Sequence, residues 1–372
     1  MPMALKGLKV LDFSTLLPGP FATLYLADLG AEVIHVESPS RPDLIRIFPP
    51  YANGQATSHS YLNRNKQSIA LDLKDAVNIE LVKNKISEFD IVIEQFRPNV
   101  MRRLGLDYET LAEINPRLIY CSITGYGQTG SYKDRAGHDI NYLALSGIAG
   151  HCGRQDSGPP PMGIQVADVA GGSLHAVMAI LAAVIERERS GMGQYIDISM
   201  TDCAVSLNAM AAAASLAAQE PQEPEKGMLN GGSFYDYYET QDGRYFAVGS
   251  LEPQFMSGLA AALDLPILMS KGMSFDPDDR KTVKAALQEK FRTQSFSIWQ
   301  QLFKNLDICV EPVLGLEEAL SSTLSEQRGW VVDVPLSTNN EQSEPQLACP
   351  IKFSRSQMHY GFIGQKLGEG KW

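Results

Sequence analysis

The 372-residue sequence has few of the features that mark metal, nucleic-acid or membrane proteins. Its five cysteines are odd in number and scattered, without Cys-x-x-Cys spacing, so we expect buried free thiols rather than a structural zinc site. Lys and Arg number 32 against 43 Asp and Glu, which gives a net charge of −11. Nucleic-acid and membrane-surface proteins need a basic face. The acidic balance therefore argues against both roles, but it leaves room for a local basic pocket.

Long apolar segments are also scarce. The first residues do not combine a basic region with an apolar core, so a signal peptide is not expected. The longest apolar stretches, residues 176–185 and 204–218, are too short to cross a bilayer. We therefore expect a cytoplasmic protein with no membrane partner. Gly-x-Gly-x-x-Gly is absent after the first expected strand, so a nicotinamide cofactor is not supported.

The first part of the chain alternates strand and helix. Apolar runs predict strands at residues 9–13, 32–36, 68–73, 90–94, 118–123 and 194–200. Helical spacing predicts helices at residues 18–28, 75–89, 168–189 and 201–219. Short strands separated by helices are typical of a parallel sheet with crossover helices. The fold class is therefore α/β, with a large domain over residues 1–220.

A smaller domain is expected after a segment rich in proline and charge, residues 220–227, which is typical of a linker. An Asp-Gly turn at 241–243 joins two aromatic strands and predicts a β-hairpin. Helices are expected near residues 254–263, 279–293 and 295–306. The expected small α+β domain spans residues 228–325. The C-terminal segment 326–372 is expected to return to the large domain.

One imidazole and one carboxylate stand in settings suited to catalysis. Of the six histidines, only His138 lies in a Gly-His-Asp sequence, and Asp168 follows at the start of a small-residue helix. Inversion of a carbon beside a carbonyl needs one group to remove a proton and another to return one to the opposite face. Taken alone, His138 also suits a structural hydrogen bond, and Asp168 suits a helix cap. Burial would raise the pKa of Asp168, whereas the helix dipole would lower it.

Several motifs resemble the family III CoA-transferase superfamily. They are residues 16–20 with 26–33, residues 94–99 with 104–107, and residues 124–130. Within that superfamily, residues 137–142, 228–232 and 251–255 resemble the α-methylacyl-CoA racemase branch. The transferases typically lack the histidine and carry a longer glycine-rich loop, where this chain has only Gly231-Gly232.

The resemblance implies a Rossmann-like large domain, a smaller domain and an interlocked homodimer. It implies an enzyme that inverts the α-carbon of 2-methylacyl-CoA thioesters through an enolate. His138 and Asp168 match the two bases, Glu252 matches a residue that orients the histidine across the dimer interface, and Asp139 is a supporting carboxylate or a cap. CoA is part of the substrate, so neither a separate cofactor nor a metal is expected.

The resemblance also implies a set of CoA-binding residues. They are Leu71, Asp72, Leu73, Lys74, Gln95, Phe96, Arg97, Arg103, Gly137, Ile140, Asn141 and Tyr142. Arg97 and Arg103 suit phosphate oxygens, and Arg64 and Lys66 would add positive charge nearby. Ser38 stands where family members often place a basic residue, and Arg41 or Arg46 could take over its contact.

Two other functions remain open at the level of sequence. In a true CoA-transferase, Asp168 would attack a thioester and form an acyl anhydride. A non-catalytic CoA-binding protein is the third possibility, although it would not need two opposed bases. The sequence does not determine the acyl chain or the metabolic pathway.

Overall fold

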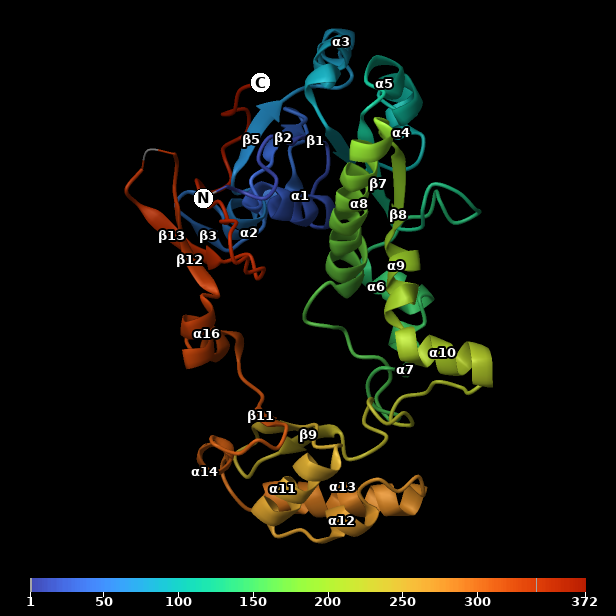
Figure 1. Cartoon of the computed structure of the whole chain (residues 1–372), viewed down its shortest axis with the longest axis vertical. Coiled ribbons are helices and arrows are strands. Elements are labelled where there is room, and N and C mark those ends of the chain that lie inside the picture. The colour runs from blue at the N-terminus through green and yellow to red at the C-terminus, as the bar shows by residue number, and fades with distance from the viewer. Residues whose placement is uncertain (1, 339) are drawn as a thin grey trace. The chain divides into compact units, whose positions relative to one another are not determined.

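The computed structural model describes residues 2–338 and 340–372 as two compact units (Figure 1). The larger unit comprises the chain up to Ser146, Met162–Leu207 and Ser322–Trp372. The smaller unit comprises Gly147–Pro161 and Asn208–Ser321. The C-terminal segment thus belongs to the larger unit.

The units divide the chain differently from the boundaries expected from sequence, because residues 147–161 and 208–220 belong to the smaller unit. Arg154 provides the physical reason. Its guanidinium forms two 2.7 Å hydrogen bonds to Asp236 and one of 2.9 Å to Glu225. Glu225 lies within the expected linker, so that segment is held on the smaller unit by ion pairs between residues far apart in sequence.

A six-stranded parallel sheet forms the centre of the larger unit, in the order β5-β2-β1-β6-β7-β8. The strands are β1 (Lys9–Asp12), β2 (Glu32–Glu37), β5 (Lys66–Ala70), β6 (Ile91–Glu94), β7 (Ile119–Thr124) and β8 (Tyr195–Ser199). This is the doubly wound order of a Rossmann-like fold, in which the chain reverses direction between β1 and β6. Ligands of such folds bind outside the carboxyl ends of the strands at this switch point.

Helices and short strands surround the sheet. The α-helices are α1 (Pro18–Asp28), α2 (Thr57–Leu62), α3 (Ala76–Lys85), α4 (Val100–Leu104), α5 (Tyr108–Ile114), α6 (Asp139–Leu145), α8 (Leu174–Ser190), α9 (Met200–Leu207) and α16 (Thr323–Arg328). The 3-10 turns are η1 (Leu44–Ile47) and η2 (Ile86–Glu88), and the π-helix is η3 (Ala167–Ser173). Two antiparallel pairs are β3 (Tyr51–Ala52) with β4 (Gln55–Ala56), and β12 (Val331–Pro335) with β13 (Ser343–Leu347).

The core of the sheet consists of the apolar residues that predicted the strands. Leu11, Ile34, Val92 and Tyr120 are buried in one cluster that also contains Val82 of α3. Parallel strands are covered on both faces, so their sequences read as nearly continuous apolar runs. That property allows the strands of this sheet to be predicted from the sequence.

The η3 and α8 segments join into one helix, Ala167–Ser190, of 24 residues with a mean hydropathy of 1.8. It is long and apolar enough to cross a membrane by length and composition, so the expectation that the apolar stretches are too short is wrong for this helix. The π-helix extends the apolar stretch at its N-terminal end. The helix packs against α1, β7 and β8 (Figure 1), and a core helix of a soluble protein meets the same criteria.

The C-terminal segment follows the edge strand β5. The Asn65 backbone N–H donates to the Phe362 carbonyl at 2.9 Å, and the Gly370 N–H donates to the Ser68 carbonyl at 2.8 Å. Trp372 packs edge-on against Phe89, with 6.2 Å between ring centroids. The segment therefore covers a strand edge that would otherwise expose unpaired backbone groups.

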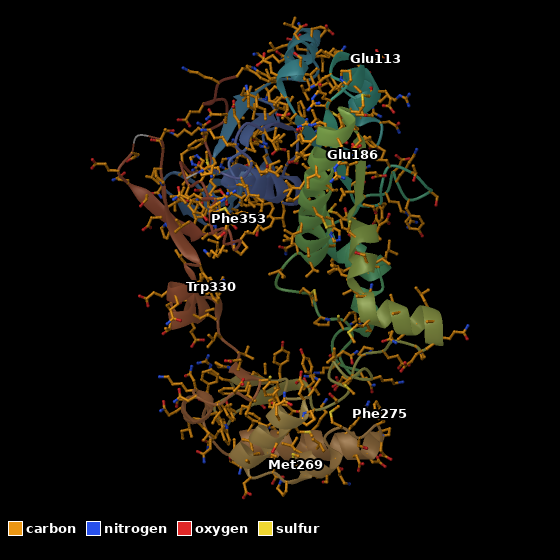
Figure 2. All side chains as sticks on the ribbon, viewed as in Figure 1. Glu113, Glu186, Met269, Phe275, Trp330 and Phe353 are labelled. Atoms are coloured by element: carbon orange, nitrogen blue, oxygen red, sulfur yellow. The ribbon has the colours of Figure 1, made fainter. Side chains whose placement is uncertain are left out.

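The smaller unit has an antiparallel sheet of β9 (Asp236–Glu239), β10 (Tyr245–Val248) and β11 (Val310–Pro312), with β10 in the centre. Its helices are α7 (Ile148–His151), α10 (Ala209–Ala218), α11 (Pro253–Leu263), α12 (Ile267–Lys271), α13 (Pro277–Phe291), α14 (Phe296–Phe303) and α15 (Leu316–Leu320). In its buried core, Phe246 stacks on Phe291, and Trp299 packs against Phe291 at a tilt. Met269 and Phe275 are exposed (Figure 2). The predicted hairpin is present, with Gly243 at φ +75° in its turn.

Candidate active site

His138 lies at the cap position of α6, where the loop after β7 turns into helix. Its backbone N–H donates to the Asn141 side-chain oxygen at 3.0 Å. A polar side chain at the third helical position that bonds back to the cap residue fixes the entry of the chain into the helix. The His138 side chain is exposed, so the imidazole is accessible to a substrate.

Asp139 links this cap to the segment that carries Asp168. One carboxylate oxygen of Asp139 accepts the backbone N–H of Ala167 at 2.7 Å and that of Asp168 at 3.1 Å. These N–H groups belong to the first turn of η3 and have no acceptor within that helix. The sequence left Asp139 as a supporting carboxylate or a helix cap. The structure shows a cap, but the capped helix is η3 and not α6, which Asp139 begins. The cap brings the residue after His138 into direct contact with the backbone of Asp168.

Burial raises the pKa of Asp168 to about 7, and the nearby charge of Asp139 adds to the effect. Between the two opposing influences expected from sequence, burial is stronger than the helix dipole. A carboxyl with a pKa near neutrality can both accept and release a proton at physiological pH.

Tyr142 fills the space beside these groups. Its hydroxyl donates to the Gly137 carbonyl at 2.6 Å, and its ring lies edge-on to Tyr126 at 5.3 Å. A Cβ at Gly125 or Gly137 would lie 2.5 or 2.6 Å from the Tyr142 ring, so both positions require glycine.

The electrostatic surroundings of Tyr142 show which groups converge there. Burial raises the pKa of Tyr142, and the charges of Asp168 and Asp139 raise it further. The guanidinium of Arg97 lowers it. Tyr142 therefore lies within electrostatic range of the Arg97 guanidinium and of both carboxylates.

The η3 segment packs against the switch point of the sheet. The Ser173 hydroxyl donates to the Pro18 carbonyl at 2.7 Å. A Cβ at Gly172 would lie 2.9 Å from the Met200 side chain and 3.4 Å from Pro18. The Gly19 N–H, in the first turn of α1, donates to the Gln95 side chain at 2.9 Å. The candidate site thus lies where β1 and β6 diverge.

The candidate CoA-binding residues lie at the carboxyl ends of two strands. Gln95, Phe96 and Arg97 follow β6, and residues 71–74 follow β5. The side chains of Lys74, Arg97, Arg103, Ile140 and Asn141 are exposed. Leu71 differs from these, because its side chain is buried in the apolar core. It can contribute only its backbone to a ligand.

Three of the cations suggested for phosphate contacts are engaged elsewhere. Arg64 is buried against Asp28, with guanidinium-to-carboxylate distances of 2.9 and 2.5 Å. Lys66 is buried and donates to the Pro20 carbonyl at 2.9 Å. Arg46 forms an ion pair with Glu37. The suggestions that Arg64 and Lys66 add charge at a CoA site, and that Arg46 replaces a basic residue at Ser38, are therefore wrong. Arg41 is exposed, so it can still provide the contact expected from a basic residue at position 38.

Glu252 belongs to the smaller unit, directly before α11. Its side chain is exposed and does not cap that helix. Its charge contributes to the raised pKa of Cys309.

Sequence reasoning did not single out Glu94, a buried carboxylate at the end of β6. The sequence signal for Glu94 is an acidic residue at the end of an otherwise apolar strand, because burying a charged group costs free energy.

We expect Asp139→Asn to lower the pKa of Asp168 below 7, because the charge of Asp139 contributes to its elevation. The amide oxygen of Asn can still accept the two backbone N–H groups, so the helix cap is retained. A carboxyl ¹³C NMR titration of the folded protein measures the change. Asp134→Asn, which alters an exposed carboxylate in the preceding loop, is the matched control. An unchanged Asp168 titration in Asp139→Asn would contradict the electrostatic link.

Comparison with known proteins covers nearly the whole chain. The family model described as CoA-transferase family III matches residues 5–368. The α-methylacyl-CoA racemase of Mus musculus is 37% identical over 94% of this chain and 86% of its own length. The succinyl-CoA:glutarate CoA-transferase of Homo sapiens is 34% identical over 95% of this chain and 81% of its own. The crystal structure of a CAIB/BAIF family protein from Brucella suis has a TM-score of 0.85 at 31% identity, covering 99% of this chain and 97% of that one.

Proposed function

This chain belongs to CoA-transferase family III, and from that premise we propose that it inverts the α-carbon of 2-methylacyl-CoA thioesters. Relatives named as racemases and as CoA-transferases have similar identity to the chain, so similarity alone does not choose between the reactions. The observation that carries the proposal is the Asp139 cap. It joins an exposed imidazole, His138, to a carboxyl whose pKa is about 7.

In the proposed reaction, the α-carbon of the thioester lies between His138 and Asp168. One group removes the α-proton while the electron pair of the C–H bond moves into the thioester and forms an enolate. The other group then delivers its proton to the opposite face, which inverts the centre. The Asn141 N–H in the first turn of α6 donates to the His138 carbonyl at 2.8 Å, whereas the Asp139 and Ile140 N–H groups have no acceptor within the helix. They are therefore donors available to the enolate oxygen.

The CoA part of the substrate is assigned to the exposed groups at the carboxyl ends of β5 and β6. Arg97 and Arg103 would pair with phosphate oxygens, and Lys74 would add a third cation. In this proposal CoA enters as part of the substrate, the enzyme works in the cytoplasm, and no separate cofactor takes part.

We also infer a homodimer in which Glu252 of a second copy orients the His138 imidazole. A carboxylate on one imidazole nitrogen fixes the tautomer and stabilises the cation formed during turnover. Exposed apolar side chains support the association. Met178 and Ile185 on α8 are 61% and 59% exposed, and Leu216 on α10 is 84% exposed. Patches of this kind commonly mark protein interfaces.

The CoA-transferase reaction is the second candidate, favoured by the 34% identical relative. There the Asp168 carboxylate would attack the thioester carbonyl, expel the CoA thiolate and form an acyl anhydride. The thiolate would then attack the Asp168 carbonyl of the anhydride, which releases the first acid as a carboxylate and leaves CoA on Asp168 as a thioester. The carboxylate of a second acid would attack that thioester and expel the thiolate again. Attack of the thiolate on the acyl carbonyl of the new anhydride would form the second acyl-CoA and free the Asp168 carboxylate. This reaction needs no histidine at position 138.

The pH dependence of the two reactions has opposite sign. When His138 acts as the base, Asp168 must hold the proton that it returns. Racemisation from that configuration therefore slows as the pH rises through the Asp168 pKa of about 7. A transferase needs the carboxylate, so its rate increases over the same range. The test measures deuterium uptake from ²H₂O at the α-carbon of a 2-methylacyl-CoA, alongside CoA transfer to a dicarboxylate. Absence of deuterium at that carbon, at any pH, would exclude the racemase.

A further inference from the structure

Glu94 is a buried carboxyl group that the proposed chemistry does not use. It is the last residue of β6 and is 4% exposed. In the parallel register Glu94 pairs with Ser122 of β7, which pairs with Asp197 of β8. On the same face, the rings of Tyr120 and Tyr195 lie 5.9 Å apart. A carboxyl group beside aromatic rings costs free energy unless hydrogen bonds compensate.

Both oxygens of Glu94 accept a hydrogen bond. The Ser122 hydroxyl donates to Oε1, and the Tyr195 hydroxyl donates to the Ser122 oxygen at 3.1 Å. The backbone N–H of Phe96 donates to Oε2 at 2.7 Å. Burial raises the pKa of Glu94 to about 7, the two hydrogen bonds oppose this rise, and the charge of Asp197 adds to it.

The Phe96 bond holds the turn that carries the candidate CoA-binding residues. Gln95 accepts the Gly19 N–H at 2.9 Å across the switch point. Phe96 packs on the core of the larger unit. Arg97 comes next along the chain, and its guanidinium is exposed. The hydrogen bond that the buried Glu94 carboxylate accepts from Phe96 therefore lies one residue away from an exposed cation.

We propose that Glu94 is the positioning residue of the CoA-binding turn, and that it acts through Arg97 on an anionic group of CoA. The inference rests on the proposed CoA binding but not on the choice between racemase and transferase. Glu94 itself lies beneath the turn, in the sheet, and does not touch the substrate. Its effect is to hold residues 95–97 in one conformation, so that the exposed Arg97 guanidinium stays at the carboxyl end of β6.

The carboxylate suits this role because two donors approach it from different elements. A backbone N–H from the turn and a hydroxyl from β7 each need an acceptor, and one carboxylate provides both. An amide of the same shape can accept from Phe96 and donate to Ser122, so Glu94→Gln should keep the turn. Glu94→Ala removes both acceptors. Glu94→Asp keeps the charge but shortens the reach by one methylene and cannot span both donors.

The experiment measures the dissociation constant of CoA by calorimetry on the full-length protein, with the thermal midpoint of each variant recorded in parallel. We expect Glu94→Ala to weaken CoA binding roughly tenfold, with kcat at saturating acyl-CoA little changed. Glu94→Gln should stay within about threefold of the parent, and Glu94→Asp should resemble Glu94→Ala. Arg97→Met should weaken binding to a similar or larger degree.

The double variant Glu94→Ala/Arg97→Met separates a positioning role from a general structural one. If Glu94 acts through Arg97, the double variant binds CoA no more weakly than Arg97→Met alone. Additive losses, or Glu94→Asp and Glu94→Ala variants that bind CoA like the parent, would overturn the proposal. If Glu94→Ala does not fold, the comparison of Glu94→Asp with Glu94→Gln in both Arg97 backgrounds still decides it. A parent protein that binds no CoA would instead overturn the proposed function.

Discussion

For the substrate configuration whose α-proton faces His138, His138→Ala lowers the rate of α-proton exchange with solvent by roughly 10²–10⁴-fold, the usual contribution of a positioned acid–base group. The imidazole is exposed beside the cap that holds Asp168, so its removal leaves one face of the α-carbon without a proton-exchanging group. Asp168→Asn has an effect of similar size, because an amide cannot exchange the proton. Deuterium uptake, resolved for each configuration of the substrate, measures both effects.

A two-base mechanism also predicts which configuration of the substrate each single variant still exchanges. Each single variant can exchange the α-proton of only one configuration, since the surviving group faces one side. His359→Ala is the matched control, because His359 is an exposed histidine of the same unit. An unchanged exchange rate in His138→Ala, together with hydroxylamine trapping of an acyl group on Asp168, would establish the transferase instead.

Arg64→Met destabilises the larger unit by about 3–5 kcal/mol, the cost of leaving one partner of a buried ion pair uncompensated. Arg64 and Asp28 are each 1% exposed. The guanidinium binds both oxygens of Asp28 and also donates to the Leu347 carbonyl at 2.7 Å. It thus connects the end of α1, the segment after α2 and β13. Its loss leaves the buried Asp28 carboxylate without a charged partner, held only by the Asn65 amide at 3.0 Å, and removes the donor to the Leu347 carbonyl.

Urea-induced unfolding, followed by a signal from the larger unit, measures this loss. Arg117→Met is the matched control. Arg117 pairs with Glu188 at 3.5 Å, but the two side chains are 52% and 68% exposed, and exposed pairs contribute about 0–1 kcal/mol. A loss of less than about 1 kcal/mol in Arg64→Met would mean that the buried pair is no stronger than a surface pair.

Much of the sheet could be predicted because parallel strands are buried on both faces. The runs at β1, β2 and β6 are apolar for that reason, and Pro18 in the first turn fixes the start of α1, which spans the predicted residues. Arg64 was wrongly expected to add charge at a CoA site because charged residues are seldom buried. Its partner Asp28 lies 36 positions away, and no local pattern joins the two residues.

Candidate residues could be proposed from the sequence, but the hydrogen bonds that connect their segments could not. The motif around His138 and the position of Asp168 could be recognised, whereas the Asp139 cap joins segments 28 and 29 residues apart. The burial that raises the pKa of Asp168 depends on packing of η3 that no local pattern shows. The roles of His138, Asp168 and Glu252 stay predictions until the variants are measured.

Because Asp168 lies in a π-helix, its direction depends on the number of residues in that segment. The seven residues Ala167–Ser173 are wound more widely than the α-helix that follows, as if one residue had been inserted into a regular helix. Loss of a single codon there would let the segment relax to α-helical winding. Residues before the deletion would then rotate by about 100° relative to α8, and the Asp168 side chain would point in a different direction. A single in-frame deletion would thus reposition this carboxyl group with no amino-acid substitution.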